Sequence, residues 1–484
     1  MASIDRLSAL PDEIISHILS FLPLKTSVST RTLAARWRFL LAYALNIQFT
    51  DRPSSSMDTI YSDRKFEDVL RKILSQCEAH GHSVITLRLH REVFWEHKLQ
   101  AYLETAFACK LKTLDLSLRE IESLPLCVLT SDTLINLKIK FFDIKMKNIT
   151  VCLPALKRLH IETAVLDGSL ENLISGCPVL EEFTYIGRIE HVCHCISSST
   201  MKRLVLECDF PYKVKIDTPA LDYLSLRYDY DIPRNVSFGS MDSLIEAHIV
   251  VFHFDDDLYS RSLVEFVGRL SSVKEMSLCL WDWGWKAPEF TPDDLNINFH
   301  NLAKLTVKGD WRFISYFVEK ANMLEVLNVI HYPEPKCEME PVQLSMANSI
   351  MKLHNLIELE LQVDWWFLTY FLEKADKLKV LIIRNNVYSK YKRKRWLMTP
   401  LQMPNCLSSH LKIVQIHELD GTDEHEVDMV RYFLKNAKVL ERMELHCLAE
   451  SVDRISSIER NSSFDRGSEK CEIVFYEHPE SDND

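Results

Sequence analysis

The chain has 484 residues, of which 47% are apolar and 26% are charged, and its formal net charge is −12. This balance is typical of a folded globular protein, and the acidic charge argues against a nucleic-acid binder, which shows basic surfaces. No apolar run approaches the length of a membrane-spanning helix, so we expect no membrane partner.

The thirteen cysteines are an odd number and follow no regular frame. The first residues, which include Asp5, Asp12 and Glu13, show no secretory pattern. Both features predict reduced thiols in a protein of the cytoplasm, the nucleus or both. A basic stretch at 390–396 fits a solvated loop better than a nuclear import signal.

Residues 10–23 predict a short amphipathic helix. Pro11 suits a first helical turn, and Asp12 and Glu13 suit the positive end of the helix dipole. Pro23 stops the helix. Apolar residues between them lie at Ile14, Ile15, Ile18, Leu19 and Leu22. A segment this short cannot bury so wide a stripe alone, so it needs a partner.

Together with Leu33 and the later Arg36-Trp37-Arg38, this segment resembles the F-box over residues 5–40. Ala34 and Thr32 depart from the usual family residues. The resemblance implies docking onto the adaptor Skp1 and, through it, a cullin. By the same resemblance, the Skp1-binding residues are Leu10, Pro11, Ile14, Ile18, Leu22, Pro23, Val28, Leu33 and Trp37.

A polar, proline-broken stretch at 51–56 then reads as a linker. Asp63 can cap a helix that ends before Gly81, a residue expected just past a helix end. Apolar residues share one face of this helix, at Phe66, Val69, Leu70, Ile73, Leu74 and Cys77.

A repeated phrase, apolar-x-x-apolar-x-apolar, occupies most of the remaining chain. It begins at Val84, Leu111, Leu134, Leu156, Leu180, Met201, Leu221, Leu244, Val273, Leu302, Leu324, Leu356, Leu378, Leu411 and Leu440. The mean period is roughly 25 residues, within the range of leucine-rich repeats. The last two apolar positions are two residues apart, which places both on one face of a strand.

A longer repeat lies inside this array. The stretch from Asn301 to Leu327, with its Tyr316-Phe317 pair, returns 54 positions later at residues 355–381. Each copy reads as strand, aromatic helix, strand, and a third variant runs from Leu411 to Leu445.

The irregular repeats are similar to those that follow plant F-boxes, and the region from Cys406 to Glu441, closed by a strand at 470–476, is similar to the FBD domain. The resemblance therefore implies an α/β chain in which a three-helix F-box precedes an irregular leucine-rich-repeat solenoid, with parallel strands on its concave side, and an FBD domain. The expected divisions are an F-box at 1–50, a linker with a first helix at 51–82, repeats at 83–400, an FBD domain at 401–477 and an acidic tail at 478–484.

The sequence carries little that predicts chemistry. Phosphate-binding glycine motifs and hydrolase motifs are absent, so we expect no catalytic residue and no cofactor. Thiols and imidazoles gather at Cys177, His191, Cys193, His194 and Cys195. Their spacing is too tight for a paired zinc site, and we interpret the cysteines as free thiols. Trp281, Trp283 and Trp285 surround a glycine in a long insertion, where they either contact a partner or pack over the rim.

The resemblance to F-box, leucine-rich-repeat and FBD proteins implies the substrate-recognition subunit of a Skp1–cullin–F-box (SCF) ubiquitin ligase, with an unknown target protein bound by the repeats and FBD domain. A small-molecule co-receptor on the same scaffold and an F-box scaffold outside a ligase remain as alternatives.

Overall fold

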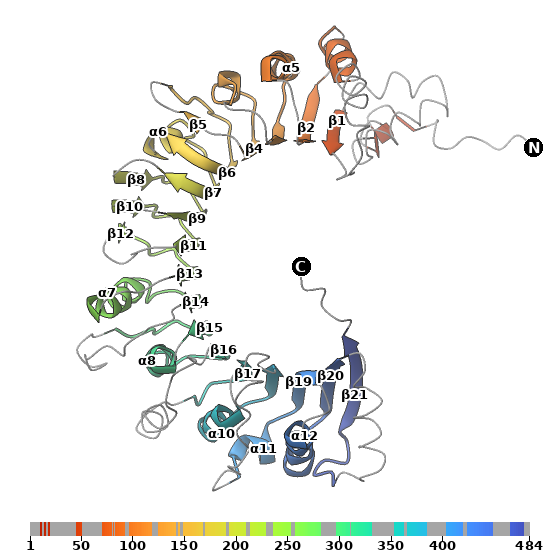
Figure 1. Ribbon diagram of the computed structural model, residues 1–484, viewed down its shortest axis with the longest axis vertical. Helices are drawn as coiled ribbons and strands as arrows, with labels where there is room; N and C mark the ends of the chain where they lie inside the picture. Colours follow the sequence, from red (N-terminus) through yellow and green to blue (C-terminus); the bar gives the residue numbers. More distant parts are fainter. Residues whose placement is uncertain are drawn as a thin grey trace, which may run out of the picture. The chain divides into compact units, whose positions relative to one another are not determined.

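In the computed structural model of the chain, the described residues are 10–11, 14–15, 18–19, 45–50, 70–79, 81, 83–91, 96–118, 124–141, 144–145, 149–167, 170–189, 193–209, 213–228, 236–252, 257–281, 297–309, 311–331, 353–362, 365–384, 403–419, 424–448 and 465–478. They form an α/β fold of parallel strands and connecting helices (Figure 1). None of the described helices is long and apolar enough to cross a membrane.

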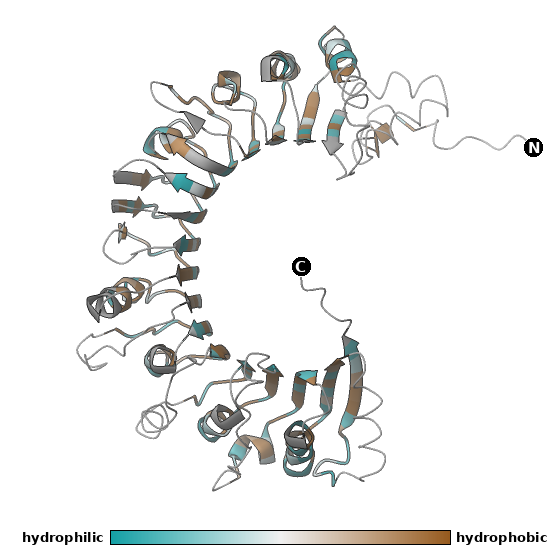
Figure 2. Ribbon diagram, in the orientation of Figure 1, coloured by the Kyte–Doolittle hydropathy of each residue, from teal (hydrophilic) through white to brown (hydrophobic). Residues whose placement is uncertain are grey.

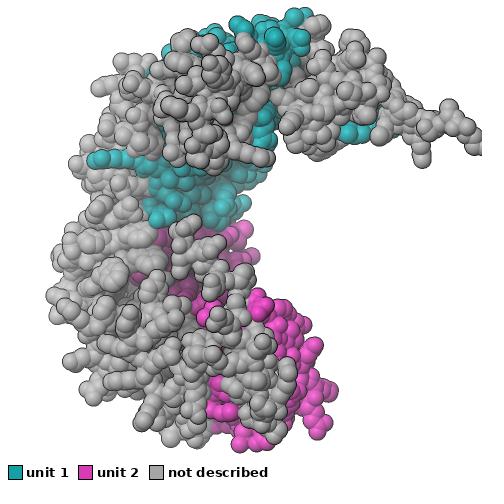
Figure 3. Space-filling view, turned by 45° about the vertical axis from the view of Figure 1, so that its right-hand side comes forward, with its two compact units in different colours: residues 1–228, 234–243 teal, residues 229–233, 244–484 magenta. Residues whose placement is uncertain are grey.

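The chain divides into two compact units (Figure 3). Unit 1 comprises residues 1–228 and 234–243, and unit 2 comprises residues 229–233 and 244–484. Each unit contains its own run of parallel strands.

The main sheet of unit 1 joins eight strands side by side in parallel. In spatial order they are β1 (Leu45–Thr50), β2 (Val84–Arg91), β3 (Thr113–Leu118), β4 (Asn136–Lys140), β6 (Arg158–Asp167), β7 (Glu182–Ile189), β9 (Arg203–Asp209) and β11 (Tyr223–Tyr228). A short strand, β5 (Ile144–Lys145), also pairs with β6. A second parallel sheet holds β8 (Cys193–Ser197), β10 (Lys213–Asp217) and β12 (Val236–Phe238).

Unit 2 stacks nine parallel strands in chain order. They are β13 (Glu246–Phe252), β14 (Glu275–Trp281), β15 (Lys304–Gly309), β16 (Val326–His331), β17 (Glu358–Gln362), β18 (Val380–Arg384), β19 (Ile413–Leu419), β20 (Arg442–Leu448) and β21 (Glu472–His478).

Within each unit the strands line one side and the helices cover the other, as in a solenoid (Figure 1). In unit 1 the helical elements are α5 (Glu96–Ala108), the 3₁₀ turn η2 (Leu126–Val128) and α6 (Leu170–Ser175). In unit 2 they are α7 (Asp257–Gly268), α8 (Trp311–Glu319), α10 (Trp365–Lys374), α11 (Asn405–Ser409) and α12 (Glu424–Asn436). In part of unit 1 the outer side is formed by strands instead of helices. These strands are β8, β10 and β12 (Figure 1).

The predicted repeat is confirmed, because each of the fifteen phrases coincides with a strand. In β3, for example, Leu114 and Leu116 are fully buried while Thr113 and Asp115 are half-buried. Leu111, the first residue of that phrase, lies before the strand and is also fully buried. The buried apolar residues of each unit come from both the strands and the outer helices, and Figure 2 shows hydrophobic colour along both kinds of element.

A recurring backbone arrangement sets the register between repeats. The residue just before a strand and the first residue of that strand both donate their N–H groups to one carbonyl of the preceding repeat. The N–H groups of Ile135 and Asn136 lie 2.8 and 3.1 Å from the Lys112 carbonyl oxygen. In unit 2 those of Glu325 and Val326 lie 2.8 and 3.0 Å from the Ala303 oxygen. Hence each strand begins level with its neighbour.

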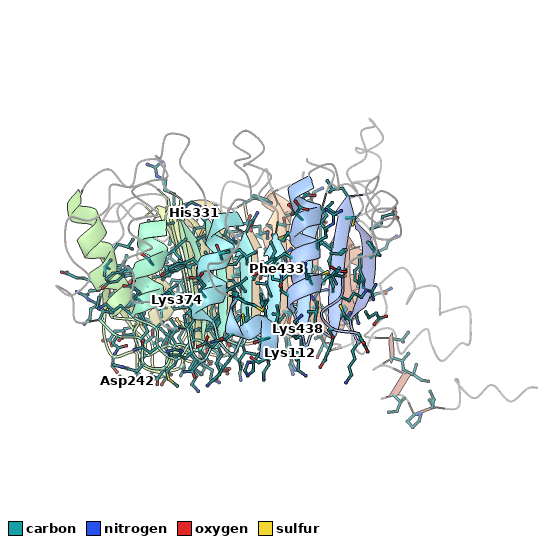
Figure 4. All side chains as sticks on the ribbon, turned by 90° about the horizontal axis from the view of Figure 1, so that it is seen from below. Lys112, Asp242, His331, Lys374, Phe433 and Lys438 are labelled. Atoms are coloured by element: carbon teal, nitrogen blue, oxygen red, sulfur yellow. The ribbon has the colours of Figure 1, made fainter. Side chains whose placement is uncertain are left out.

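The duplicated segment is confirmed as a repeated module of strand, helix and strand: β15-α8-β16, then β17-α10-β18. Each helix carries an edge-to-face aromatic pair, with ring centroids 5.2 Å apart for Tyr316 and Phe317 and 5.8 Å apart for Tyr370 and Phe371. The third variant, β19-α12-β20, repeats the pair at 5.5 Å with Tyr432 and Phe433 (Figure 4). In each pair the phenylalanine is buried beneath its helix, so the module conserves one packing unit.

The predicted helix before the repeats is confirmed in its described part, residues 70–79, where Leu70, Leu74 and Cys77 are buried. Gly81 follows with a φ of 67°, and its N–H lies 3.2 Å from the Glu78 carbonyl oxygen. Glycine adopts this left-handed conformation without steric cost, so it ends the helix at the predicted place.

The sequence analysis did not predict β1, β5 or the sheet of β8, β10 and β12. It also missed the last residues of β6, Leu166 and Asp167, which pair with β5. β1 falls within the expected F-box range, yet it pairs with β2 over its whole length. Its residues alternate between apolar and polar from Leu45 to Phe49, and this signal could have revealed it. The outer strands have at most five residues, and their described buried residues include Ile196, Val214, Ile216 and Val236.

Replacing Phe371 by alanine removes the largest buried side chain among those that the structure describes in α10. We expect Phe371→Ala to lower the free energy of unfolding by about 3–5 kcal/mol, because it leaves a cavity in a closely packed layer. Lys374→Ala on the same helix, whose ammonium lies 5.9 Å from the Tyr370 ring (Figure 4), should cost less than about 0.5 kcal/mol. Urea unfolding followed by circular dichroism measures both, and equal effects would contradict this packing.

Candidate functional site

The N-terminal helix presents two different faces. The N–H groups of Ile14 and Ile15 both lie 3.1 Å from the Pro11 carbonyl oxygen, so the helix begins at Pro11 as predicted. Ile15 is fully buried and Leu19 is nearly so, whereas Ile14 is 47% exposed and Ile18 is half-buried. The chain thus covers one apolar face and leaves the other accessible.

Two other predicted docking residues lie within the described part of the chain. Leu10 is half-buried and Pro11 is exposed. Leu22, Pro23, Val28, Leu33 and Trp37 lie outside the described residues, so their role stays a prediction.

Besides the N-terminal helix, the chain has a second candidate binding surface. It is the face of each sheet that points away from the helices. Because side chains alternate along a strand, every second residue of each repeat lies on this face. We call it the strand face. In each repeat it is formed by the residues directly before, between and after the last two apolar residues of the phrase. The two units differ in what they place there.

In unit 1 the strand face is polar and internally hydrogen-bonded. Asn136 donates to the Thr113 hydroxyl at 3.0 Å, and Arg158 donates to the Asn136 side-chain oxygen at 3.1 Å. Arg158 also donates to Glu182 at 2.9 Å. One continuous ladder therefore crosses four strands, and its polar groups are already satisfied by one another.

Charged and titratable residues occupy most of the next two strand-face positions of β2, β3, β4 and β6. His90 Nε2 lies 2.9 Å from Asp115 Oδ1, and Lys140 pairs with Glu162 at 2.5 Å. Burial, and then the nearby charges of Lys138 and Lys140, lower the pKa of His160. The lowered pKa favours the neutral form of the His160 imidazole.

In unit 2 a group of aliphatic side chains takes the place of the polar ladder. Half-buried residues of the strand face on β16, β18 and β19 form what we call the aliphatic patch: Val326, Ile330, Val380, Ile382 and Ile413. At the corresponding described positions of unit 1, the aliphatic residues are Ile186 and Val205. The sequence analysis missed this patch, although branched aliphatic residues at the normally polar strand positions mark it.

An open depression of about 420 Å³ adjoins the starts of β16, β17 and β18. Met323 and Ile357 in its lining are 52% and 37% exposed. Its lining is otherwise polar, and the full set is Met323, Glu325, Asn355, Ile357, Lys377, Lys379 and His410.

Stacked rings cross the last three strands of unit 2. The His417 and His446 rings are 4.0 Å apart at 7°, and the His446 and Tyr476 rings are 4.7 Å apart at 15°. The register shifts after Ile416, and Glu418 has a φ of 61°, which is uncommon for a residue other than glycine. The register shift is a β-bulge, and it lies at His417 and Glu418, where the His417 ring stacks on His446.

The predicted tryptophan cluster is described only in part. Trp281 is the last residue of β14, opposite Phe252 of β13, while Trp283 and Trp285 lie outside the described residues. Their contact with a target stays a prediction. The basic stretch 390–396 also lies outside the described residues.

The cysteine cluster does not converge on a metal-binding geometry where it is described. Cys177 is buried, and its thiol lies 3.3 Å from the Leu173 carbonyl oxygen. Burial raises the pKa of Cys177 to about 12, so it holds its proton, whereas zinc binds thiolates. Cys193 and Cys195 belong to β8, and His191 lies outside the described residues. Within the described part of the chain, no three His, Cys, Asp or Glu residues form a group that could hold a metal ion.

Comparisons with known proteins match three parts of the chain to family models. The F-box domain matches residues 7–43, the leucine-rich repeats of FBD-associated F-box protein At5g56370 match 99–245, and the FBD family matches 399–445. The chain belongs to the F-box/FBD/LRR-repeat family. The FBD match spans α11, β19, α12 and the start of β20, so in this family member it coincides with the third copy of the repeated module.

Relatives from Arabidopsis thaliana extend over nearly the whole F-box/FBD/LRR-repeat chain. Putative F-box/FBD/LRR-repeat protein At5g44950 is 27% identical over 477 residues, which cover 91% of this chain and 92% of the relative. Putative F-box/FBD/LRR-repeat protein At5g22670 is 26% identical over 493 residues, covering 98% of each chain. F-box/LRR-repeat protein At3g59200 is 27% identical and covers 91% of this chain and 81% of its own.

The buried thiols predict a loss of stability at high pH. Burial raises the pKa of Cys77, Cys177 and Cys406 to about 12 from an ordinary value near 9. The folded state therefore holds more protons than the unfolded state between these values. The contribution of these thiols to the free energy of unfolding is fully present below about pH 9, and it should be lost as the pH rises toward 12.

Thermal unfolding followed by circular dichroism at pH 8 and pH 10.5 tests this expectation. The midpoint should fall at pH 10.5, and a Cys177→Ala/Cys406→Ala variant should show a smaller drop between the two values. Cys152→Ala, at an exposed thiol, is the control and should leave the drop unchanged. An equal drop in all three proteins would show that these thiols do not cause it.

Proposed function

We propose that this F-box protein is the substrate-recognition subunit of an SCF ubiquitin ligase. The F-box would dock Skp1, and Skp1 would connect the chain to a cullin. The strand faces of the leucine-rich repeats and FBD region would hold a target protein for ubiquitination. The observation that carries the proposal is the accessible Ile14–Ile18 face of the N-terminal helix, whose opposite face is already buried.

The energetics of this helix support an adaptor-docking role. Complete burial of an isoleucine side chain contributes about 1.5–3 kcal/mol before the cost of association is subtracted. Ile14 is 47% exposed in the unbound chain, so much of that contribution is still to be gained. Because Ile14 and Ile18 are one helical turn apart, a single partner surface can cover both.

The chain would contribute proximity rather than chemistry. A repeat array offers an extended surface for a protein target, and tethering raises the local concentration of that target near the ubiquitin donor. Ubiquitin transfer would belong to other subunits. The cytoplasm, the nucleus or both are the proposed sites of action.

Substitution of the accessible face tests adaptor binding. We expect Ile14→Asp/Ile18→Asp to raise the Kd for a purified plant Skp1 at least about tenfold, because two carboxylates would be carried into an apolar contact. Ile245→Asp is the matched control, since Ile245 is also 47% exposed but lies in unit 2. Isothermal titration calorimetry measures all three proteins, and unchanged binding by the double variant would refute the docking face.

Affinity capture with and without proteasome inhibition then tests recruitment. Wild type should capture proteins that accumulate only when degradation is blocked. With the double variant, the recovery of these proteins should not depend on the inhibitor. Identical recoveries would refute recruitment through the helix, whereas a cullin should co-purify only with the wild type.

A further inference from the structure

The strand face of unit 2 contains a carboxylate set among aliphatic side chains. In register, Glu358 of β17 lies between Val326 of β16 and Val380 of β18. The Glu358 side chain is half-buried and has no hydrogen bond or ion pair with another described residue, while its backbone N–H donates to the Glu325 carbonyl oxygen at 3.0 Å. Its charge is therefore available to a partner.

The neighbouring carboxylate is different. Glu360, the next residue of β17 on the strand face, forms an ion pair with Arg384 of β18. Glu360 is thus neutralised within the sheet, and Glu358 provides the local excess of negative charge. Lys377 and Lys379, two lysines that line the adjoining depression, do not belong to β17, and neither forms an ion pair with Glu358.

Unit 1 shows what this position looks like when it is satisfied internally. Glu182 occupies the same first strand position in β7, and it accepts a hydrogen bond from Arg158 at 2.9 Å. The neighbours of Glu182 in register are Arg158 and Arg203. Glu358 has two valines in place of these two arginines, so its sheet supplies apolar contact and no counter-charge.

We propose that the aliphatic patch and Glu358 together bind a segment of the target protein in which a lysine or arginine is flanked by aliphatic residues. This proposal deepens the ligase role and depends on it for the identity of the partner as a degradation target. The basic side chain would pair with Glu358, and the flanking residues would cover Val326, Val380, Ile382 and Ile413. Partial removal of water by these aliphatic groups strengthens the charge pairing relative to a fully exposed pair.

The dimensions of the sheet restrict the spacing of such a segment. Neighbouring strands lie about 4.8 Å apart, so Val326 and Val380, on either side of β17, are separated by roughly 10 Å. Side chains of a fully extended chain alternate between two faces, whereas a chain in the polyproline II conformation advances about 3.1 Å per residue with three residues per turn, so residues three apart share one face about 9 Å apart. The two flanking aliphatic residues should therefore lie about three residues apart, with the basic residue between them.

Three sets of synthetic ten-residue peptides provide the probe. One set carries Leu-Lys-Ala-Leu at its centre, the second carries Leu-Glu-Ala-Leu, and the third carries Ser-Lys-Ala-Ser. Fluorescence anisotropy with the full chain should show the first set bound at least about tenfold more tightly than the other two. Equal affinities for the three sets, or preference for the glutamate set, would overturn the proposal.

Substitutions in the chain then place the binding. Glu358→Lys should reverse the preference toward the glutamate set, and Ile382→Asp should weaken binding of the lysine set about tenfold. Glu182→Lys and Val205→Asp are matched controls at the same strand positions of unit 1, and they should leave the peptide affinities unchanged. A Glu358→Lys protein that keeps the original preference would also overturn the proposal, since that charge-reversed result does not depend on a loss of folding.

Adaptor binding provides an independent measurement. Loss of Skp1 binding with peptide discrimination intact would reject the ligase role alone. Skp1 binding without peptide discrimination would reject only the basic-aliphatic specificity.

Discussion

Alignment of each strand with the one before it is the constraint on which the rest of the structure depends. Two N–H groups share one carbonyl of the preceding repeat, and the three apolar residues of the phrase then face the interior. A shift of one residue would move Leu114 and Leu116 to the surface and Thr113 and Asp115 to the core. The buried residues and the backbone hydrogen bonds therefore enforce the same register, and each strand face inherits its composition from that register.

The repeat is also what made most of the fold predictable from the sequence. The spacing of Leu111, Leu114 and Leu116 needs only local geometry to be read as the start of a strand, and the same holds for the other repeats. The Tyr-Phe pairs at a fixed offset likewise revealed a copied module. Gly81 was predictable because so few residues tolerate its backbone conformation.

What the sequence does not reveal depends on contacts between distant residues. The division near residue 244 leaves no mark, because the phrase continues through it unchanged. The amphipathic pattern alone does not separate the exposed Ile14 from the buried Ile15, since both belong to one wide apolar stripe, and only the family resemblance selected Ile14 and Ile18 for docking. Likewise, the difference between Glu182 and Glu358 becomes visible only when their cross-strand neighbours are known. The predicted docking and target residues thus required the structure to separate accessible groups from satisfied ones.

Strand β1 changes the meaning of the polar stretch at 51–56. That stretch reads as a tether between a docking module and an array, but β1 precedes it and pairs with β2 beyond it. It therefore connects two segments that the sheet already holds together. Extra residues inserted there would lengthen the chain between β1 and β2 without changing their pairing, whereas residues inserted before Leu45 would change the reach between the docking helix and the first rung of the array.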